Sequence, residues 1–244
     1  MPTVALIDLN ARHDNHGVSS ITTMIKAAGY RVERFEPRVE GTLPGPGFDA
    51  YILTGGPGSP LEDAPWRHEL LAAVGQWKAP VVGVCMGFQL LAQVHGWTVR
   101  QLSHPRFGIH RLRLTGAGRA HPLTAPLAAD AAFEQRRFGV FAPDSDERPT
   151  GDILATGEDG DITAARFAPN VLGVIFHPEA APGLVAQLFT ENDTIREKLL
   201  ERHGPERFRR MVDLIPRLEG PFRTILPGFL HQARRLNQGP PCSA

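Results

Sequence analysis

The sequence predicts an α/β protein with an open, mostly parallel sheet and helices on both faces of that sheet. Three observations support this prediction. Short apolar runs recur along the first half of the chain, longer helical patterns separate them, and brief turns rich in glycine or proline connect the two. Strands that alternate with helices in this way form βαβ units, in which neighbouring strands run parallel.

Strands and helices alternate in order through the first part of the chain. Four short runs rich in apolar and β-branched residues are expected to be strands: 4–7, 30–35, 50–54 and 81–84. Three segments with helical patterns are expected to be helices: 19–28, 63–77 and 88–95. Gly29 and Gly96 follow two of these segments, where glycine commonly ends a helix. The order predicts a doubly wound, flavodoxin-like sheet.

The chain changes character after Trp97. Strand-like segments separated by glycines follow, and the apolar strand 171–176 comes after them. The simplest interpretation is an antiparallel excursion that returns to a last core strand. Beyond residue 190 the chain is charged and helical at 191–202 and 208–218, and prolines divide what comes next. We therefore expect one domain over residues 1–190 and a C-terminal helical extension over 191–244.

Composition argues against two classes of partner. Lys plus Arg and Asp plus Glu are equal at 26 each, so no field of one sign suggests a nucleic-acid-binding protein. No apolar run approaches the ~20 residues that span a bilayer, and the N-terminus does not resemble a signal peptide. Cys85 and Cys242 lie in different contexts, so no disulfide is expected. This cysteine usage suits the cytoplasm.

Cys85 stands where a strand turns directly into a helix. Gly83 and Gly87 would keep this turn tight and open to a ligand. The N-terminus of the helix favours a thiolate, and the Met86 N–H could donate to a developing oxyanion. The alternative is that Cys85 is a small buried apolar side chain. The Gly-x-Cys-x-Gly frame leaves these two interpretations evenly balanced.

His177 is the best candidate for the base that a thiol nucleophile needs. It ends the apolar strand 171–176, and open α/β sheets assemble their sites at such strand ends. Glu179 could accept a hydrogen bond from the imidazole and fix its tautomer. Without Cys85, the His-Pro-Glu sequence would be an ordinary turn.

The loop Gly55-Gly56-Pro57-Gly58 follows the strand at 50–54. Its glycines allow the backbone to come close to a ligand, so we expect Gly55 at the substrate and the Gly56 N–H as a second oxyanion donor. Taken alone, the loop would be only a turn. It lacks the lysine and the spacing of a phosphate-binding loop.

Together these segments resemble the class I glutamine amidotransferases, and within that family the glutaminase domain of GMP synthase. The matching segments are Leu-Thr-Gly-Gly-Pro-Gly-Ser-Pro at 53–60, Gly-Val-Cys-Met-Gly-Phe-Gln at 83–89 and Gly-Val-Ile-Phe-His-Pro-Glu at 173–179. The resemblance covers about residues 3–189 and is specific, because the cysteine turn and the His-Pro-Glu sequence occur together and in order.

The resemblance implies hydrolysis of L-glutamine through a γ-glutamyl thioester on Cys85. His177 would transfer protons, and Glu179 would orient His177. The other implied contacts are the Gly56 and Met86 amides as an oxyanion hole and Gln89 on the bound glutamine. No cofactor and no metal are expected, because His13, Asp14 and His16 are better explained as a polar loop than as a zinc site.

The segment that would bind the amino-acid end of glutamine differs from the sequence usual in the family. It is Glu-Gln-Arg-Arg-Phe at 134–138. Arg136 and Arg137 are candidates for the substrate carboxylate. A contact with a partner protein and a solvated surface remain alternatives for both.

Three functions are compatible with these motifs. The first is a stand-alone glutaminase that supplies ammonia to a separate synthetase, or a self-contained amidotransferase, since no ATP pyrophosphatase domain is visible. The second is a γ-glutamyl hydrolase or transferase that acts on another small amide. The third is a non-catalytic binding protein, which the joint presence of Cys85, His177 and Glu179 disfavours.

Overall fold

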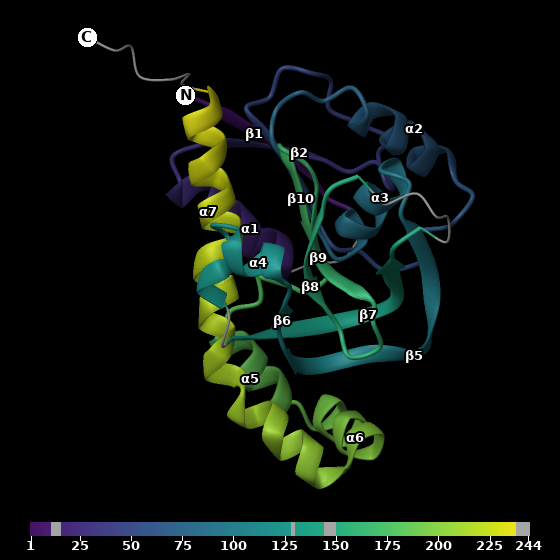
Figure 1. Ribbon diagram of the computed structural model, residues 1–244, viewed down its shortest axis with the longest axis vertical. Coiled ribbons are helices and arrows are strands. Elements are labelled where there is room, and N and C mark those ends of the chain that lie inside the picture. Colours follow the sequence, from purple (N-terminus) through teal and green to yellow (C-terminus); the bar gives the residue numbers. More distant parts are fainter. Residues whose placement is uncertain (11–15, 128–129, 144–149, 238–244) are drawn as a thin grey trace.

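The computed structural model describes residues 1–10, 16–127, 130–143 and 150–237. Within these residues, one sheet of ten strands runs through the molecule with helices on both sides (Figure 1). The strands are β1 (Thr3–Ile7), β2 (Arg31–Phe35), β3 (Ala50–Leu53), β4 (Val81–Val84), β5 (Thr98–Arg111), β6 (Arg113–Leu114), β7 (Ala131–Phe141), β8 (Asp152–Thr156), β9 (Ile162–Ala168) and β10 (Val171–Val174). The helices are α1 (His16–Ala27), α2 (Pro65–Val74), α3 (Met86–Val94), α4 (Gly116–Ala120), α5 (Pro182–Thr190), α6 (Asp193–Asp213) and α7 (Glu219–Asn237), with short 3-10 helices η1 (Ala125–Leu127) and η2 (Ile215–Leu218).

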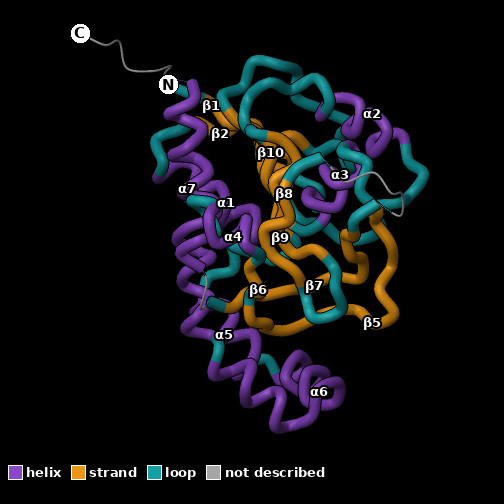
Figure 2. The backbone as a smooth tube through the Cα atoms, viewed as in Figure 1, coloured by secondary structure: helices purple, strands orange, loops and turns teal. Residues whose placement is uncertain are grey.

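The sheet has a parallel part and an antiparallel part. Its strand order is β2-β1-β3-β4-β10-β9-β7-β5, with β8 also paired to β9 and β6 paired to β8. The strands from β2 to β10 are parallel to their neighbours, and all other pairings are antiparallel (Figure 2). The predicted mostly parallel sheet with an antiparallel excursion is confirmed. Because β1, β3, β4 and β10 are parallel, the segments that follow them meet at one edge of the sheet.

Apolar cores cover the two faces of the parallel strands. Side chains alternate along β1, so that Val4 and Leu6 lie in one core and Ala5 and Ile7 in the other. Helices α1 and α7 cover the first core, and α2 and α3 cover the second (Figure 1). The predicted helices on both faces are confirmed. No helix within the described residues is both long enough and apolar enough to cross a membrane.

The C-terminal helix α7 corrects one expectation. Prolines are expected to divide this region, but α7 runs through both Pro221 and Pro227. Pro221 lies in the first turn, where its missing N–H costs no helical hydrogen bond. The apolar face of α7 compensates for Pro227, because Ile225 and Phe229 are buried in the same core as Val4 of β1. The boundary at residue 190 stays a prediction.

Candidate active site

Cys85 occupies a strained turn between β4 and α3. Its backbone has φ 51° and ψ −104°, and it is the only non-glycine residue with positive φ among the described residues. A side chain in this region costs on the order of 1–3 kcal/mol, and such strain concentrates at functional sites. The surrounding chain holds the turn in place: the Cys85 N–H donates to Val174 O at 2.9 Å, and the Gly87 N–H donates to Thr54 O at 3.0 Å.

Two glycines are required at this turn by space. A Cβ on Gly83 would lie 2.6 Å from the carbonyl carbon of Gly87, and a Cβ on Gly87 would lie 2.5 Å from Leu53 O. Neither contact could be relieved by a side-chain movement, because both involve backbone atoms. The Gly-x-Cys-x-Gly spacing therefore lets β3, β4 and α3 come together around the cysteine.

His177 and Glu179 form a hydrogen-bonded pair just beyond the end of β10. His177 Nδ1 lies 2.8 Å from Glu179 Oε1, and the Glu179 side chain is only 6% exposed. The His177 N–H donates to Phe133 O at 2.9 Å, which fixes the backbone beneath the ring. Because Nδ1 faces the carboxylate, Nε2 is left free, and it has no hydrogen-bond partner among the described residues. This is the tautomer arrangement that a base next to a thiol requires.

The charge environment favours the protonated form of His177. Burial lowers the pKa of the imidazole, but the opposing effects of the Glu179 carboxylate and then of the Cys85 thiolate outweigh it, so that the pKa is raised well above the usual histidine value. The two side chains lie close together, since both border the space in front of Gly55. This setting therefore favours transfer of the thiol proton to His177, which leaves a thiolate beside an imidazolium.

Glu179→Gln is expected to lower the pKa of His177, because burial then acts without its main opposing charge. A raised folded pKa contributes stability that is full below the unfolded histidine value of about 6.5 and is lost as pH rises through the folded value. The wild type should therefore have a higher free energy of unfolding than Glu179→Gln at low pH, and this difference should shrink as the pH rises through the folded pKa of His177. NMR titration of His177 and urea unfolding across pH measure both effects. An unchanged His177 titration would contradict the pairing, and Glu191→Gln is an exposed control.

Gly55 lies against both Cys85 and His177. A Cβ on Gly55 would lie 3.1 Å from His177 Cε1 and 3.3 Å from Cys85 Cβ. Gly55→Ala should therefore displace the two side chains by a few tenths of an ångström and lower turnover by about tenfold to a hundredfold, because misplacement at a reacting centre is costly. Steady-state kinetics measures the loss, and Gly45→Ala, which meets no atom within 4 Å, is the control. Full activity of Gly55→Ala would show that catalysis does not need the space that the absent side chain of Gly55 leaves beside Cys85 and His177.

The two predicted oxyanion donors lie on the segments that flank Cys85. Met86 is the first residue of α3, and Gly56 follows Gly55. Neither N–H donates to an acceptor within the described residues. Both are therefore available to a ligand, and their role stays a prediction.

Strand β7 passes over the cysteine. Cys85 Sγ lies 3.8 Å from Gln135 O, and Gln89 Nε2 donates to Phe138 O at 3.0 Å. The segment 134–138, predicted to bind the amino-acid end of the substrate, thus lies beside Cys85. Gln89, predicted to contact glutamine, is buried at the same place and is held by β7.

Arg136 and Arg137 differ sharply in environment. Arg136 is buried: its Nε lies 2.8 Å from Glu134 Oε2 and its Nη2 lies 2.5 Å from Asp161 Oδ2. Burial alone would lower the pKa of Arg136, but these two carboxylates raise it. Its guanidinium is therefore committed within the protein, which leaves the predicted substrate contact without support. Arg137 points away on the other face of β7 and is exposed.

Some candidate residues lie outside the described part of the chain. Among those considered at the sequence level, His13, Asp14 and Cys242 fall there, and His16 is described only as the first residue of α1. Sequence reasoning also missed residues that contact the Gly55 carbonyl: Asn10 and Thr54. Their signal was a polar residue just beyond each of two apolar strands.

The chain is similar to known proteins over most of its length. A family model described as glutamine amidotransferase class-I matches residues 13–196. A glutamine-hydrolyzing GMP synthase subunit from Saccharolobus solfataricus is 29% identical over 138 residues, which are 54% of this chain and 68% of that protein. The aminodeoxychorismate synthase of Streptomyces griseus is 34% identical over 163 residues, which are 66% of this chain but only 21% of that protein. A solved glutamine amidotransferase from Thermotoga maritima shares the fold, with a TM-score of 0.70 at 16% identity over 94% of this chain and 99% of that chain.

Fold and site define an α/β protein with a cysteine on a strand-to-helix turn at the carboxyl edge of a parallel sheet. The match over residues 13–196 makes the assignment specific. The chain belongs to the class I glutamine amidotransferase family, whose members hydrolyse glutamine.

Proposed function

We propose that this chain hydrolyses L-glutamine to glutamate and ammonia, with Cys85 as nucleophile, His177 as base and Glu179 as the group that orients His177. The observation that supports this best is the 2.8 Å contact from His177 Nδ1 to Glu179, which leaves Nε2 free beside the strained Cys85. A free imidazole nitrogen next to a thiol at a helix N-terminus is the arrangement that activates a cysteine.

The reaction proceeds in two steps. Cys85 Sγ attacks the carboxamide carbon while its proton passes to His177, and the tetrahedral oxyanion accepts hydrogen bonds from the Gly56 and Met86 amides. The C–N bond then breaks, and His177 gives the proton to the leaving ammonia. A γ-glutamyl thioester remains on Cys85. Water, deprotonated by His177, attacks the thioester, and glutamate leaves as Cys85 regains its proton.

The glutamine lies between the Cys85 turn and β7 in this proposal. Gly55 gives it close access to the sulfur, and Gln89 and the backbone of β7 contact its amino-acid end. Arg137 is exposed and has no ion pair within the part of the chain that the structure describes, so its guanidinium can take the substrate carboxylate or a partner. The ammonia passes to a separate synthetase, as the name of the related GMP synthase protein, which is one subunit of its enzyme, suggests.

The test is to capture the acyl-enzyme. Purified protein is mixed with L-glutamine, quenched in acid and digested, and mass spectrometry should find a γ-glutamyl group on the peptide that contains Cys85. Released ammonia is measured in parallel for L-glutamine, and released methylamine for γ-glutamyl-methylamide. Labelling and release with γ-glutamyl-methylamide alone would favour the γ-glutamyl hydrolase alternative. No labelling by either amide or by an electrophilic glutamine analogue would favour a non-catalytic binding protein.

A further inference from the structure

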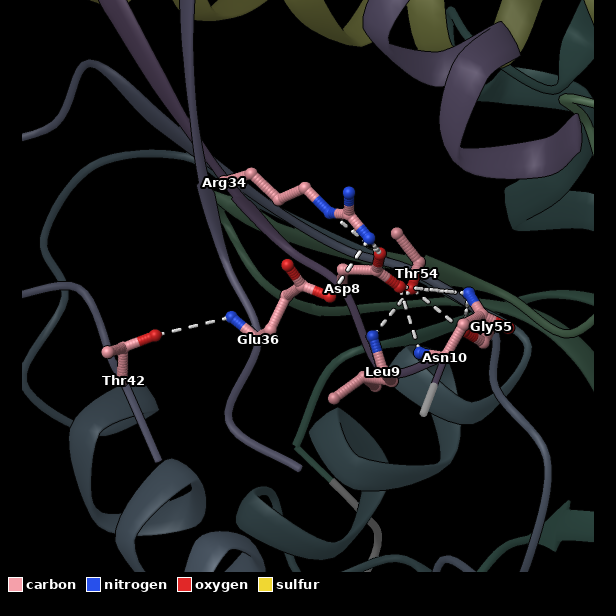
Figure 3. A network of polar contacts seen from close by, with 8 residues as sticks. All are labelled: Asp8, Leu9, Asn10, Arg34, Glu36, Thr42, Thr54 and Gly55. Carbon is pink, nitrogen blue, oxygen red and sulfur yellow. Dashed lines mark hydrogen bonds and ion pairs between the residues drawn. The ribbon is translucent and has the colours of Figure 1, made fainter. Parts of the chain in front are cut away.

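Two side chains hold the carbonyl of Gly55 from the side of β1. Asn10 Nδ2 donates to Gly55 O at 3.0 Å, and Thr54 Oγ1 donates to the same oxygen at 2.7 Å (Figure 3). Asn10 lies just beyond β1, and Thr54 directly follows β3. Both side chains are buried, so water does not compete for the carbonyl.

The Asn10 amide is itself fixed by a buried carboxylate. Asp8 Oδ1 accepts from the Asn10 N–H at 2.9 Å and from Asn10 Nδ2 at 3.0 Å, while Asp8 Oδ2 accepts from Arg34 Nε at 2.9 Å and from Arg34 Nη2 at 2.5 Å. Thr54 Oγ1 accepts from the Leu9 N–H at 2.9 Å. Figure 3 shows Arg34, Asp8, Asn10, Thr54 and Gly55 as one connected network. A charged pair with several donors makes a rigid anchor.

The direction of the Gly55 carbonyl decides the direction of the Gly56 N–H. No cis peptide occurs in the described residues, and in a trans peptide the N–H points opposite to the C=O. Strand β3 lies between β1 and β4. A carbonyl held toward β1 therefore turns the N–H toward β4, where Cys85 lies. The peptide is adjacent to the nucleophile, since a Cβ on Gly55 would be 3.3 Å from Cys85 Cβ.

We propose that Asn10 is a positioning residue for catalysis, which, together with Thr54, keeps the Gly56 N–H directed at the oxyanion. This inference rests on the proposed glutaminase function. If the Gly55–Gly56 peptide flips, a carbonyl oxygen replaces the N–H beside the developing negative charge, and the activation barrier of the acylation step rises. Asn10 acts only through this peptide, and Asp8 with Arg34 holds Asn10.

Asn10→Ala is expected to lower kcat for ammonia release by about tenfold to a hundredfold, because loss of a whole oxyanion donor costs about 10²–10³ and Thr54 still holds the carbonyl. KM should stay within about twofold, since the oxyanion exists only in the transition state. Thr54→Val, nearly isosteric, should lower kcat in the same way. The double variant should lose more than either single variant.

The matched control is Asn170→Ala. Asn170 Nδ2 also holds backbone carbonyls, donating to Lys78 O at 2.9 Å and to Ala79 O at 3.3 Å, but it precedes β10 and so lies at the opposite edge of the sheet. Its replacement should leave kcat unchanged. If Asn10→Ala and Asn170→Ala lower kcat equally, in proportion to their losses of stability, Asn10 is only structural and the inference is wrong.

Crystal structures of the wild type, Asn10→Ala and the double variant test the inference without any assay. We expect the Gly55–Gly56 peptide to be flipped in the variants. Iodoacetamide, whose reaction forms no oxyanion, should still alkylate Cys85. A peptide that keeps its wild-type orientation in both variants overturns the inference. A wild type that neither releases ammonia nor is labelled at Cys85 by an electrophilic glutamine analogue counts against the proposed function, and the peptide orientation still decides the role of Asn10.

Discussion

Cys85→Ala is expected to reduce ammonia release from L-glutamine by about 10⁴-fold or more, because the residues of a nucleophile–base–acid unit act together and loss of the nucleophile removes the covalent route. The purified wild type and the variant are assayed side by side for ammonia and glutamate. The variant should still fold, since the methyl group of alanine occupies the place of the Cys85 Cβ. It should also bind L-glutamine, which calorimetry measures.

Cys85→Gly separates chemistry from strain. Glycine adopts φ 51° without the penalty that a side chain meets there, although it adds entropy to the unfolded chain. Its free energy of unfolding should therefore be at least equal to that of Cys85→Ala, while both variants are inactive. A glycine variant that is clearly less stable than the alanine variant would show that the turn is not strained at Cys85.

Each outcome of the Cys85 comparison leads to a definite conclusion. Ammonia release that persists in Cys85→Ala would exclude the proposed nucleophile. Release by neither protein, together with labelling of Cys85 by an electrophilic glutamine analogue, would indicate a latent glutaminase that needs its synthetase. Release by neither protein without labelling by the analogue would favour a different amide substrate if γ-glutamyl-methylamide acylates Cys85, and a non-catalytic binding protein if it does not.

The carboxyl edge of the parallel sheet could be predicted because its signals are local. Cys85 and His177 each follow a short apolar strand, and parallel strands end at the same edge, so their proximity follows from the order of the elements. The hold of Asn10 on the Gly55 carbonyl could not be predicted, because it joins residues 45 positions apart through a side chain that no periodic pattern marks. Long-range polar contacts of this kind depend on the folded geometry.

The C-terminal helical extension was predicted, but the continuity of α7 through its prolines and the burial of Arg136 were not, for different reasons. Proline is a strong local signal against a helix, and in α7 burial of Ile225 and Phe229 outweighs it. Arg136 and Arg137 are equivalent in the sequence, yet strand alternation sends them to opposite faces of β7. Asp161, which forms an ion pair with the buried Arg136, lies just before β9.

Arg136→Met is expected to lower the free energy of unfolding by about 3–5 kcal/mol, because it leaves the buried Glu134 carboxylate without its cation and leaves Asp161 with only the more distant Arg106, at 3.7 Å. The same guanidinium donates from Nη1 to Phe138 O at 3.2 Å, which also holds Gln89. Urea unfolding, read by fluorescence, measures the loss.

Arg137→Met is the matched control, since it changes the exposed neighbour on the same strand in the same way. It should leave the free energy of unfolding within about 0.5 kcal/mol of the wild type, as surface changes usually do.

The kinetics of the two variants then separate a structural role from substrate binding. If Arg137 binds the substrate carboxylate, its replacement raises KM at unchanged stability. If Arg136→Met instead raises KM while stability is retained, the buried cluster is not structural and the prediction of a substrate contact at Arg136 is restored. A loss of stability confined to Arg136→Met would establish that this arginine supports β7 from within, and a raised KM confined to Arg137→Met would assign the substrate contact to Arg137.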